Sequence, residues 1–137
     1  MVGFSGNNVK DAGMIQLCTL AASAIKEMAK GNRKNQDAIA EAGAIPPLVA
    51  MLGALAPQMQ ANAAGALANL AHNHPDNQGA IARTGAVAPL CLLVREGSDE
   101  TKDESAWAIW SLATDHAPNK VRGSSMPCLL TAPRCVC

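Results

Sequence analysis

Apolar residues recur along much of this chain at the spacing of an amphipathic helix, and the pattern is clearest in residues 58–71. One side of that segment carries small and aliphatic residues, namely Ala63, Ala64, Leu67, Leu70 and Ala71. Spacings of i, i+3 and i+4 place them on one face of an α-helix, which we expect to be buried. Similar periodicity predicts one helix from about Asp11 or Met14 to Lys30 and another at about 100–113.

Glycine and proline separate shorter helices between these segments. A helix is expected at about 35–42 and ends at Gly43, because glycine readily adopts the left-handed conformation that closes a helix. A second short helix begins near Pro46, since proline is tolerated in a first helical turn. Pro57 and Pro75 then bound the third and longest helix.

This three-helix layout returns after 42 residues. The segment "NQDAIAEAGAIPPLVAML" (35–52) aligns with "NQGAIARTGAVAPLCLLV" (77–94). At the same period, "AASAIKEMAKGNRKN" (21–35) aligns with "AAGALANLAHNHPDN" (63–77) and with "SAWAIWSLATDHAPN" (105–119). Self-similarity at such a period is typical of a repeat architecture, in which neighbouring units share one core.

The period divides the chain into four parts. They are an irregular N-terminus with a partial repeat at 1–34, two full repeats at 35–76 and 77–119, and an irregular tail at 120–137. In the first part "VKDAGMIQL" is similar to the sequence around Gly43 but at an offset of 30, so a degenerate capping unit and a truncated repeat both remain open. In the tail, Gly123 and Pro127 stand where the pattern requires an apolar residue and a glycine, so we expect no regular structure there.

Three helices per roughly 42 residues, with "EAGAIPPLV" at the first junction and "NAAGALANLA" in the third helix, resemble the armadillo repeat. The resemblance covers about residues 14–119 and is nearest to vacuolar armadillo adaptors, with β-catenin and importin-α more distant. It implies an all-α solenoid, wound as a right-handed superhelix, whose third helices line a concave groove. HEAT repeats are the alternative, but the glycine junctions Gly43 and Gly85 argue against them.

In the armadillo arrangement, the side of each third helix opposite the core faces this groove. The residues that the resemblance places there are Asn62, Gly65 and Asn69 of one unit, Glu104, Trp107 and Ser111 of the next, and Ser23 and Glu27 of the preceding one. Asn69 matches the family's groove asparagine, whose amide both donates and accepts hydrogen bonds and so suits an extended main chain. From the residues alone, Asn69 is equally well explained as a solvated side chain.

Importin-α pairs a groove tryptophan with an asparagine four residues later, and this chain breaks that pattern. Trp107 is followed by Ser111, and Asn69 is preceded by Gly65. Recognition of nuclear localisation signals is therefore not expected, although acidic residues of the last third helix favour a basic ligand. Trp107 and Trp110 are three residues apart, so we expect them to point to different places, with Trp110 at an edge as an interface anchor or as a contact for a missing repeat.

Composition narrows the remaining possibilities. Only 2 % of residues are aromatic and alanine is abundant, which favours closely packed helices. There is no dense basic stripe for nucleic acid and no apolar run long enough to cross a membrane, and the N-terminus lacks a secretory pattern. We expect a cytoplasmic protein, with a nuclear location left open.

No sequence motif points to chemistry. The chain has no glycine-rich phosphate loop, GxSxG, HExxH or CxxC, so we expect no catalytic residue, no cofactor and no enzyme activity. "HNH" at 72–74 lies at a helix C-terminus, where histidine interacts with the helix dipole, and we expect no metal there. Cys18 and Cys91 lie in apolar pattern, the spacing of Cys128, Cys135 and Cys137 fits no zinc module, and reduced thiols are expected.

We therefore expect a module that binds an extended segment of a partner protein in its groove. Two alternatives remain open: a substrate-recruiting fragment of a larger ubiquitin ligase or nuclear-import adaptor, and a truncated repeat protein without independent activity. Repeat arrays need about three units and polar caps to fold alone. With two units and a fraction, this chain is expected to need further repeats or self-association.

Overall fold

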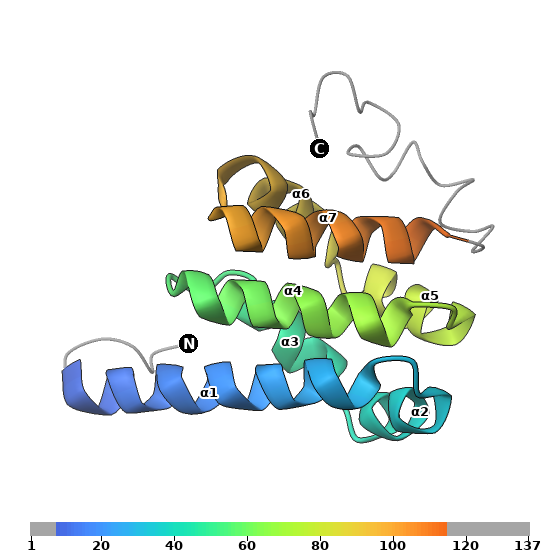
Figure 1. The fold of residues 1–137 in the computed structure, drawn as a ribbon, viewed down its shortest axis with the longest axis horizontal. Coiled ribbons are helices and arrows are strands. Elements are labelled where there is room, and N and C mark those ends of the chain that lie inside the picture. Colours follow the sequence, from blue (N-terminus) through green and yellow to red (C-terminus); the bar gives the residue numbers. More distant parts are fainter. Residues whose placement is uncertain (1–7, 115–137) are drawn as a thin grey trace.

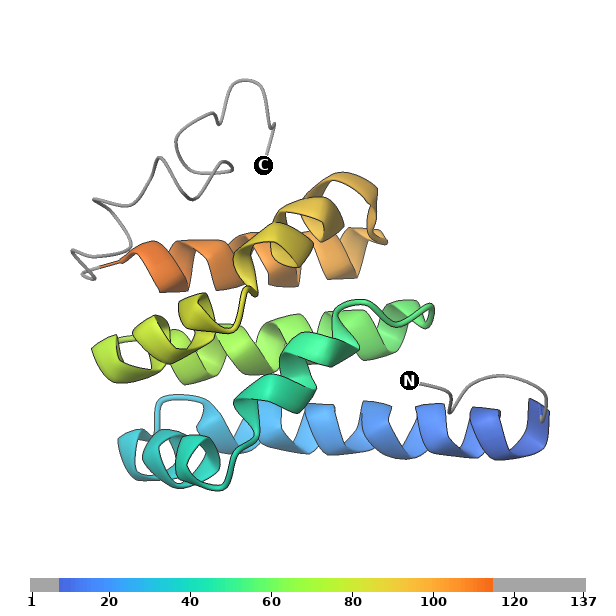
Figure 2. The same cartoon turned by 180° about the vertical axis from the view of Figure 1, so that it is seen from behind.

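The computed structural model describes residues 8–114, with side chains from residue 12 onward, and this part of the chain forms helices without a strand. The helices are α1 (Asn8–Ala29), α2 (Arg33–Glu41), α3 (Ile45–Met51), α4 (Pro57–Ala71), α5 (Pro75–Arg83), α6 (Val87–Glu96) and α7 (Asp99–Ala113). In Figure 1, α1, α4 and α7 lie side by side in one layer. Figure 2 shows the shorter helices across the other side of that layer. The all-α solenoid is confirmed.

The helix order repeats as the sequence predicted. Helices α2, α3 and α4 form one unit, α5, α6 and α7 form the next, and α1 is the third helix of a preceding partial unit. The expected start of α1 near Asp11 or Met14 is too late, because the helix begins at Asn8 and continues through Gly13. Gly13 has no positive φ, so "VKDAG" does not form the glycine junction that its similarity to the Gly43 region suggested. The predicted tail at 120–137 lies outside the described residues.

The glycine junctions form as expected. Gly43 and Gly85 have φ of +81° and +80°, the left-handed region that glycine enters without steric cost. At Gly43, the N–H of Ala44 donates to Ile39 O and the N–H of Gly43 donates to Ala40 O. This pair of bonds is the Schellman motif, which satisfies the last carbonyls of α2 and turns the chain into α3.

The first helix of each unit begins with a side-chain cap that the sequence analysis missed. Asn32 Oδ1 accepts a hydrogen bond from the backbone N–H of Asn35 at 3.0 Å, at the start of α2. At the equivalent place before α5, His74 Nδ1 accepts from the N–H of Asn77 at 3.2 Å. His74 Nε2 lies 2.7 Å from Asp37 Oδ1. The expected role of His74 at a helix C-terminus is therefore wrong, since it caps the following helix.

The predicted core face of α4 is buried. Its five residues are at most 1 % exposed, namely Ala63, Ala64, Leu67, Leu70 and Ala71. Alanine also fills the sides of α4, where Ala61, Ala66 and Ala68 are 0 % exposed because α1 and α7 pack against them. Small side chains let three helices lie close together without aromatic residues in the core.

A glutamine in each unit joins the ends of neighbouring third helices. The Gln78 amide donates towards Ala71 O of α4 and towards Ser111 O and Thr114 O at the end of α7, each at 3.0 Å. Gln36, one period earlier, makes the same set of contacts at the ends of α1 and α4. Both glutamines are at most 3 % exposed. The "NQ" pairs that reveal the repeat are therefore the residues that fasten one unit to the next.

Candidate partner-binding face

The exposed side of α1, α4 and α7, opposite their packing against the shorter helices, is called here the third-helix face. Its most unusual feature is an aromatic cluster formed by His72, Trp107 and Trp110. The two indoles stack with centroids 4.8 Å apart and planes at 17°. His72 lies 5.2 Å from Trp107 and 6.0 Å from Trp110. The expectation that the two tryptophans point to different places is wrong, because side chains three residues apart on a helix are neighbours.

This cluster is accessible. Trp107 is 38 % and Trp110 is 50 % exposed, whereas burial is usual for such large apolar rings. Ring pairs at these separations contribute about 0.5–1.5 kcal/mol beyond area burial, so they hold each other in place. The chain thus presents a fixed aromatic surface where a partner's apolar or cationic side chains gain contact area.

An ion pair crosses the middle of the same face. Lys26 of α1 and Glu104 of α7 are joined by a hydrogen-bonded salt bridge, although α4 lies between their helices. Both side chains are about one fifth exposed, at 22 % and 21 %. The bridge passes over Gly65, where a Cβ atom would lie 2.7 Å from Glu104 Oε2 and 2.8 Å from Lys26 Cδ and Cε. Gly65 therefore leaves the space that the ion pair occupies.

The asparagines of α4 connect this helix to α1. Asn69 Nδ2 donates to Lys26 O at 2.8 Å, and Asn62 Nδ2 donates to Thr19 O at 3.2 Å. The two asparagines and the two carbonyls are both seven residues apart, which is two helical turns. Asn69 is half-buried, and its Oδ1 has no hydrogen-bond partner among residues 12–114. The donor of Asn69 is therefore used within the fold, which leaves Oδ1 as the atom that a ligand could contact.

The structure separates the residues predicted for the groove into three groups. Glu27 and Trp107 are exposed; Ser23, Asn69 and Glu104 are partly buried; Asn62, Gly65 and Ser111 are buried. Ser111 is 1 % exposed and its Oγ has no partner in the described part of the chain. The expectation that Asn62, Gly65 and Ser111 lie at the surface is wrong. Asn62 is 8 % exposed beside α1, where its amide donates to Thr19 O, Gly65 lies under the bridge between Lys26 and Glu104, and Ser111 is 1 % exposed. The binding role of the eight residues remains a prediction.

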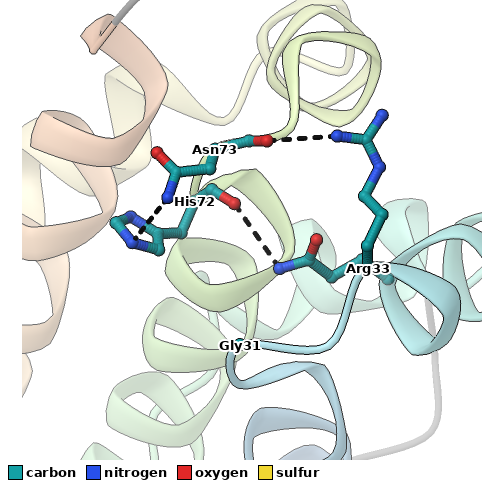
Figure 3. Close-up of a pocket in the computed structure, with 5 residues that line it drawn as sticks. Gly31, Arg33, His72 and Asn73 are labelled. Atoms are coloured by element: carbon teal, nitrogen blue, oxygen red, sulfur yellow. Dashed lines mark hydrogen bonds between the residues drawn. The ribbon is translucent and has the colours of Figure 1, made fainter.

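A shallow pocket adjoins the aromatic cluster at the ends of α1 and α4. Figure 3 shows its lining residues, Gly31, Arg33, Gln36, His72 and Asn73. Arg33 Nη1 donates to Asn73 O at 3.1 Å, and Arg33 Nε lies 3.6 Å from Asp37 Oδ1, so the charge of this arginine is already partnered. His72 lines the pocket and also belongs to the aromatic cluster, so the pocket lies next to the third-helix face.

The histidines of "HNH" occupy different environments. His72 stacks on the tryptophans, whereas His74 is 2 % exposed and bonded to Asp37 and Asn77. Among the described residues, no group of three His, Cys, Asp or Glu side chains is placed to hold a metal ion.

Cys18 is a free thiol, but Cys91 is disulfide-bonded, so the expectation of reduced thiols is wrong for Cys91. None of the helices in residues 8–114 is long and apolar enough to cross a membrane.

Two stretches of the chain, residues 32–72 and 74–114, match the family model described as "Armadillo/beta-catenin-like repeat". Together they cover more than half of its 137 residues. The chain belongs to the armadillo-repeat family. This match agrees with the unit of α2–α4 and the unit of α5–α7, and the nearer likeness to vacuolar armadillo adaptors stays a prediction. No curated protein matches the chain.

Solved armadillo structures share this fold. A computationally designed armadillo repeat protein for modular peptide recognition is 27 % identical with a TM-score of 0.79, covering 87 % of this chain and 50 % of that one. A designed armadillo repeat protein in complex with the peptide (KR)4 is 26 % identical with a TM-score of 0.61, covering 80 % of this chain and 43 % of that one. This chain therefore spans half or less of the length of these armadillo structures, whose fold is a scaffold for binding.

Proposed function

We propose that this armadillo chain is a protein-interaction module that binds an extended segment of a partner protein along its third-helix face. The observation that carries the proposal is the exposed stack of Trp107 and Trp110, held beside His72 on that face. Aromatic side chains of this kind dominate the binding energy of protein interfaces. Designed armadillo relatives made for peptide recognition add support from the fold.

The spacing of the helices suits an extended chain. Packed helices lie about 8–10 Å apart, and an extended peptide advances about 3.3 Å per residue. A segment crossing from α1 to α7 therefore meets a new helix every two or three residues. Along that path it passes the free acceptor of Asn69 and the carboxylate of Glu104 before it reaches the tryptophans. Each polar contact contributes about 1 kcal/mol, so the aromatic contacts set the affinity.

A displayed library of random linear peptides tests this function. Peptides selected on the wild-type chain are expected to lose at least about tenfold in affinity for the Trp107→Ala, Trp110→Ala double variant, because both hot-spot rings are removed. The matched control is Leu92→Ala, which removes an exposed apolar side chain, 48 % accessible, from α6 in the other layer. Unchanged binding to the double variant, with circular dichroism showing intact helices, would refute the aromatic site.

A library that yields no binder would refute the proposed function and favour a fragment without independent activity. If the selected peptides resemble segments of ubiquitin-ligase substrates or of nuclear-import cargo, that result would favour a role in the corresponding larger assembly. The module itself is proposed to act by binding, without a cofactor, a metal or catalysis, in the cytoplasm or the nucleus.

A second proposed interaction uses the outer side of α1 and a second copy of this chain. Leu17 and Met28 are 63 % and 52 % exposed, whereas their equivalents in α4, Met59 and Leu70, are 3 % and 0 % exposed. The covering helices of α4 have no counterpart on this side of α1 within the described residues. The outer side of α7, at the opposite end of the stack, is also uncovered within the described residues. Ala106 of α7 is exposed there, whereas its equivalent in α4, Ala64, is buried.

Joining α1 of one copy to α7 of another repeats the kind of contact made between α4 and α7, and it competes with a partner bound at Trp110, which lies on that edge of α7. A head-to-tail arrangement of this kind does not close by symmetry. Light scattering is expected to show association that rises with concentration and is lost in Leu17→Glu. A concentration-independent monomer for the wild type would contradict this second proposal.

A further inference from the structure

The ion pair between Lys26 and Glu104 lies on the path that an extended partner must take. The bridge joins α1 to α7 directly over Gly65 of α4. A peptide that crosses the three helices of the third-helix face would meet it at the centre. The partner must therefore pass above the bridge or open it.

Opening requires a replacement for one of the two charges. Glu104 is only 21 % exposed, and leaving a partly buried carboxylate without its partner is costly. The least costly way to open the bridge is to supply another cation to Glu104. Exposed Glu100 and Asp103, on the same turn of α7, add negative potential that favours such a cation.

The position of Lys26 is specific to its unit. Its equivalents in the next two units are Ala68, which is 0 % exposed, and Trp110. Gly65 is equally specific, because its equivalents are Ser23 and Trp107, and any side chain there would collide with the bridge. Two departures from the repeat thus coincide in one contact, which indicates that the bridge is a feature of this chain and not of every armadillo unit.

We propose that Lys26 is an internal competitor for the partner: it occupies Glu104 in the free protein, and a basic side chain of the bound segment takes its place beside the tryptophans. This inference rests on the proposed function and adds the chemistry of the partner, a segment with Lys or Arg at the position that meets Glu104. A neutral segment has nothing to exchange for Lys26 and binds only over the closed bridge. One solved neighbour of the same fold, a designed armadillo repeat protein, is in complex with the peptide (KR)4, so this scaffold accommodates such a chain.

The test uses two labelled peptides of equal length, an alternating Lys-Arg peptide and an alternating Ser-Gln peptide, with binding measured by fluorescence anisotropy. Lys26→Met removes the competing charge and keeps the apolar stem. It is expected to raise affinity for the Lys-Arg peptide about three- to fivefold, the range that an ion pair of this exposure supports. The matched control is Lys30→Met, which removes the same charge from an exposed position one turn further along the chain.

Glu104→Gln completes the design. This variant also weakens the hold on Lys26, but it removes the negative charge that would bind the incoming cation. The preference for the Lys-Arg peptide over the Ser-Gln peptide is therefore expected to fall to the level that long-range charge attraction alone gives. Because both variants change partly buried side chains, helix content by circular dichroism verifies that each is folded. The two substitutions combined are expected to match Glu104→Gln alone.

Equal affinity gains in Lys26→Met and Lys30→Met would overturn the inference, since they would show a long-range charge effect only. Absence of Lys-Arg binding to every variant would also overturn it, while selected library peptides that still depend on the tryptophans would leave the proposed function intact. If neither the library nor the two probes bind, the proposed function fails as well.

Discussion

Replacing Gln78 tests how the repeats are held together. Its Nε2 lies 3.0 Å from each of three carbonyl oxygens, those of Ala71, Ser111 and Thr114. The side chain is 1 % exposed, so no water replaces these bonds when they are lost. The substitution Gln78→Met keeps the length of the side chain and its helix propensity but removes the donor.

The magnitude follows from the chemistry of one amide group. Its NH2 has two protons, so at most two of the three carbonyls receive a well-directed bond at once. Ala71 O also accepts from the N–H of His74 at 3.1 Å, so the carbonyls that lose this donor without another are those of Ser111 and Thr114 within residues 12–114. At about 1–3 kcal/mol each, this loss costs about 3 kcal/mol. Gln78 Oε1 has no hydrogen-bond partner in residues 12–114, and removing that atom recovers about 1 kcal/mol. The net expectation is a loss of about 2 kcal/mol in the free energy of unfolding.

Urea unfolding followed by circular dichroism measures this loss. At a slope of about 1.5 kcal/mol per molar, the midpoint is expected to fall by about 1.3 M. Gln58→Met is the matched control, because Gln58 is exposed and bonds only to Glu100, and it is expected to change stability by under about 0.5 kcal/mol. Gln78→Glu is expected to cost more than Gln78→Met, since it turns acceptor oxygens towards carbonyl oxygens. Equal stability of Gln78→Met and wild type would refute the reasoning.

Three further predictions concern local structure. Gly85→Ala is expected to cost about 1 kcal/mol in urea unfolding because φ is +80°, whereas Gly13→Ala, inside α1 with open space at its Cβ, is expected to gain up to about 1 kcal/mol; the reverse order would contradict this. His74→Ala is expected to cost about 1–2 kcal/mol and His74→Asn about half as much, because asparagine restores the cap but not the contact with Asp37; equal losses would show that the cap is unimportant. The stacked indoles predict an exciton couplet in circular dichroism that disappears in Trp110→Phe, and a spectrum without it in the wild type would show that the rings are apart.

The fold was predictable from the sequence because the signal is repeated. Each junction between helices occurs in both repeats. The glycines, prolines and alanine-rich faces that mark a helix in one repeat therefore support the same assignment in the other. The start of α1 was missed because no first or second helix of its unit precedes it among the described residues, so the repeat gives no aligned boundary there. The caps were missed because Asn32 and His74 are different residue types in equivalent positions, and only the hydrogen bonds reveal the shared role.

The candidate site was predictable only in part. Helical spacing identified Trp107 and Glu104 on the correct side of α7, but it treated each third helix separately. The contacts that shape the face run between helices: Lys26 reaches Glu104 across α4, and Asn69 bonds to a carbonyl of α1. A pattern with a period of 42 residues has no information about such pairs, because Lys26 and Glu104 are 78 residues apart and not equivalent.

The position shared by Lys26, Ala68 and Trp110 shows why equivalence in the repeat does not fix the environment of a side chain. Ala68 is 0 % exposed because α7 packs against it, whereas Trp110 is 50 % exposed because no helix of residues 8–114 lies beyond α7. A further unit stacked on α7, as α7 stacks on α4, would contact Trp110 where α7 contacts Ala68. The indole would then have to leave its stack on Trp107 or hold the new helix away. Continuation of the solenoid past α7 and display of the aromatic cluster therefore exclude each other in this geometry, and a partner that binds the cluster competes with any helix that would extend the array.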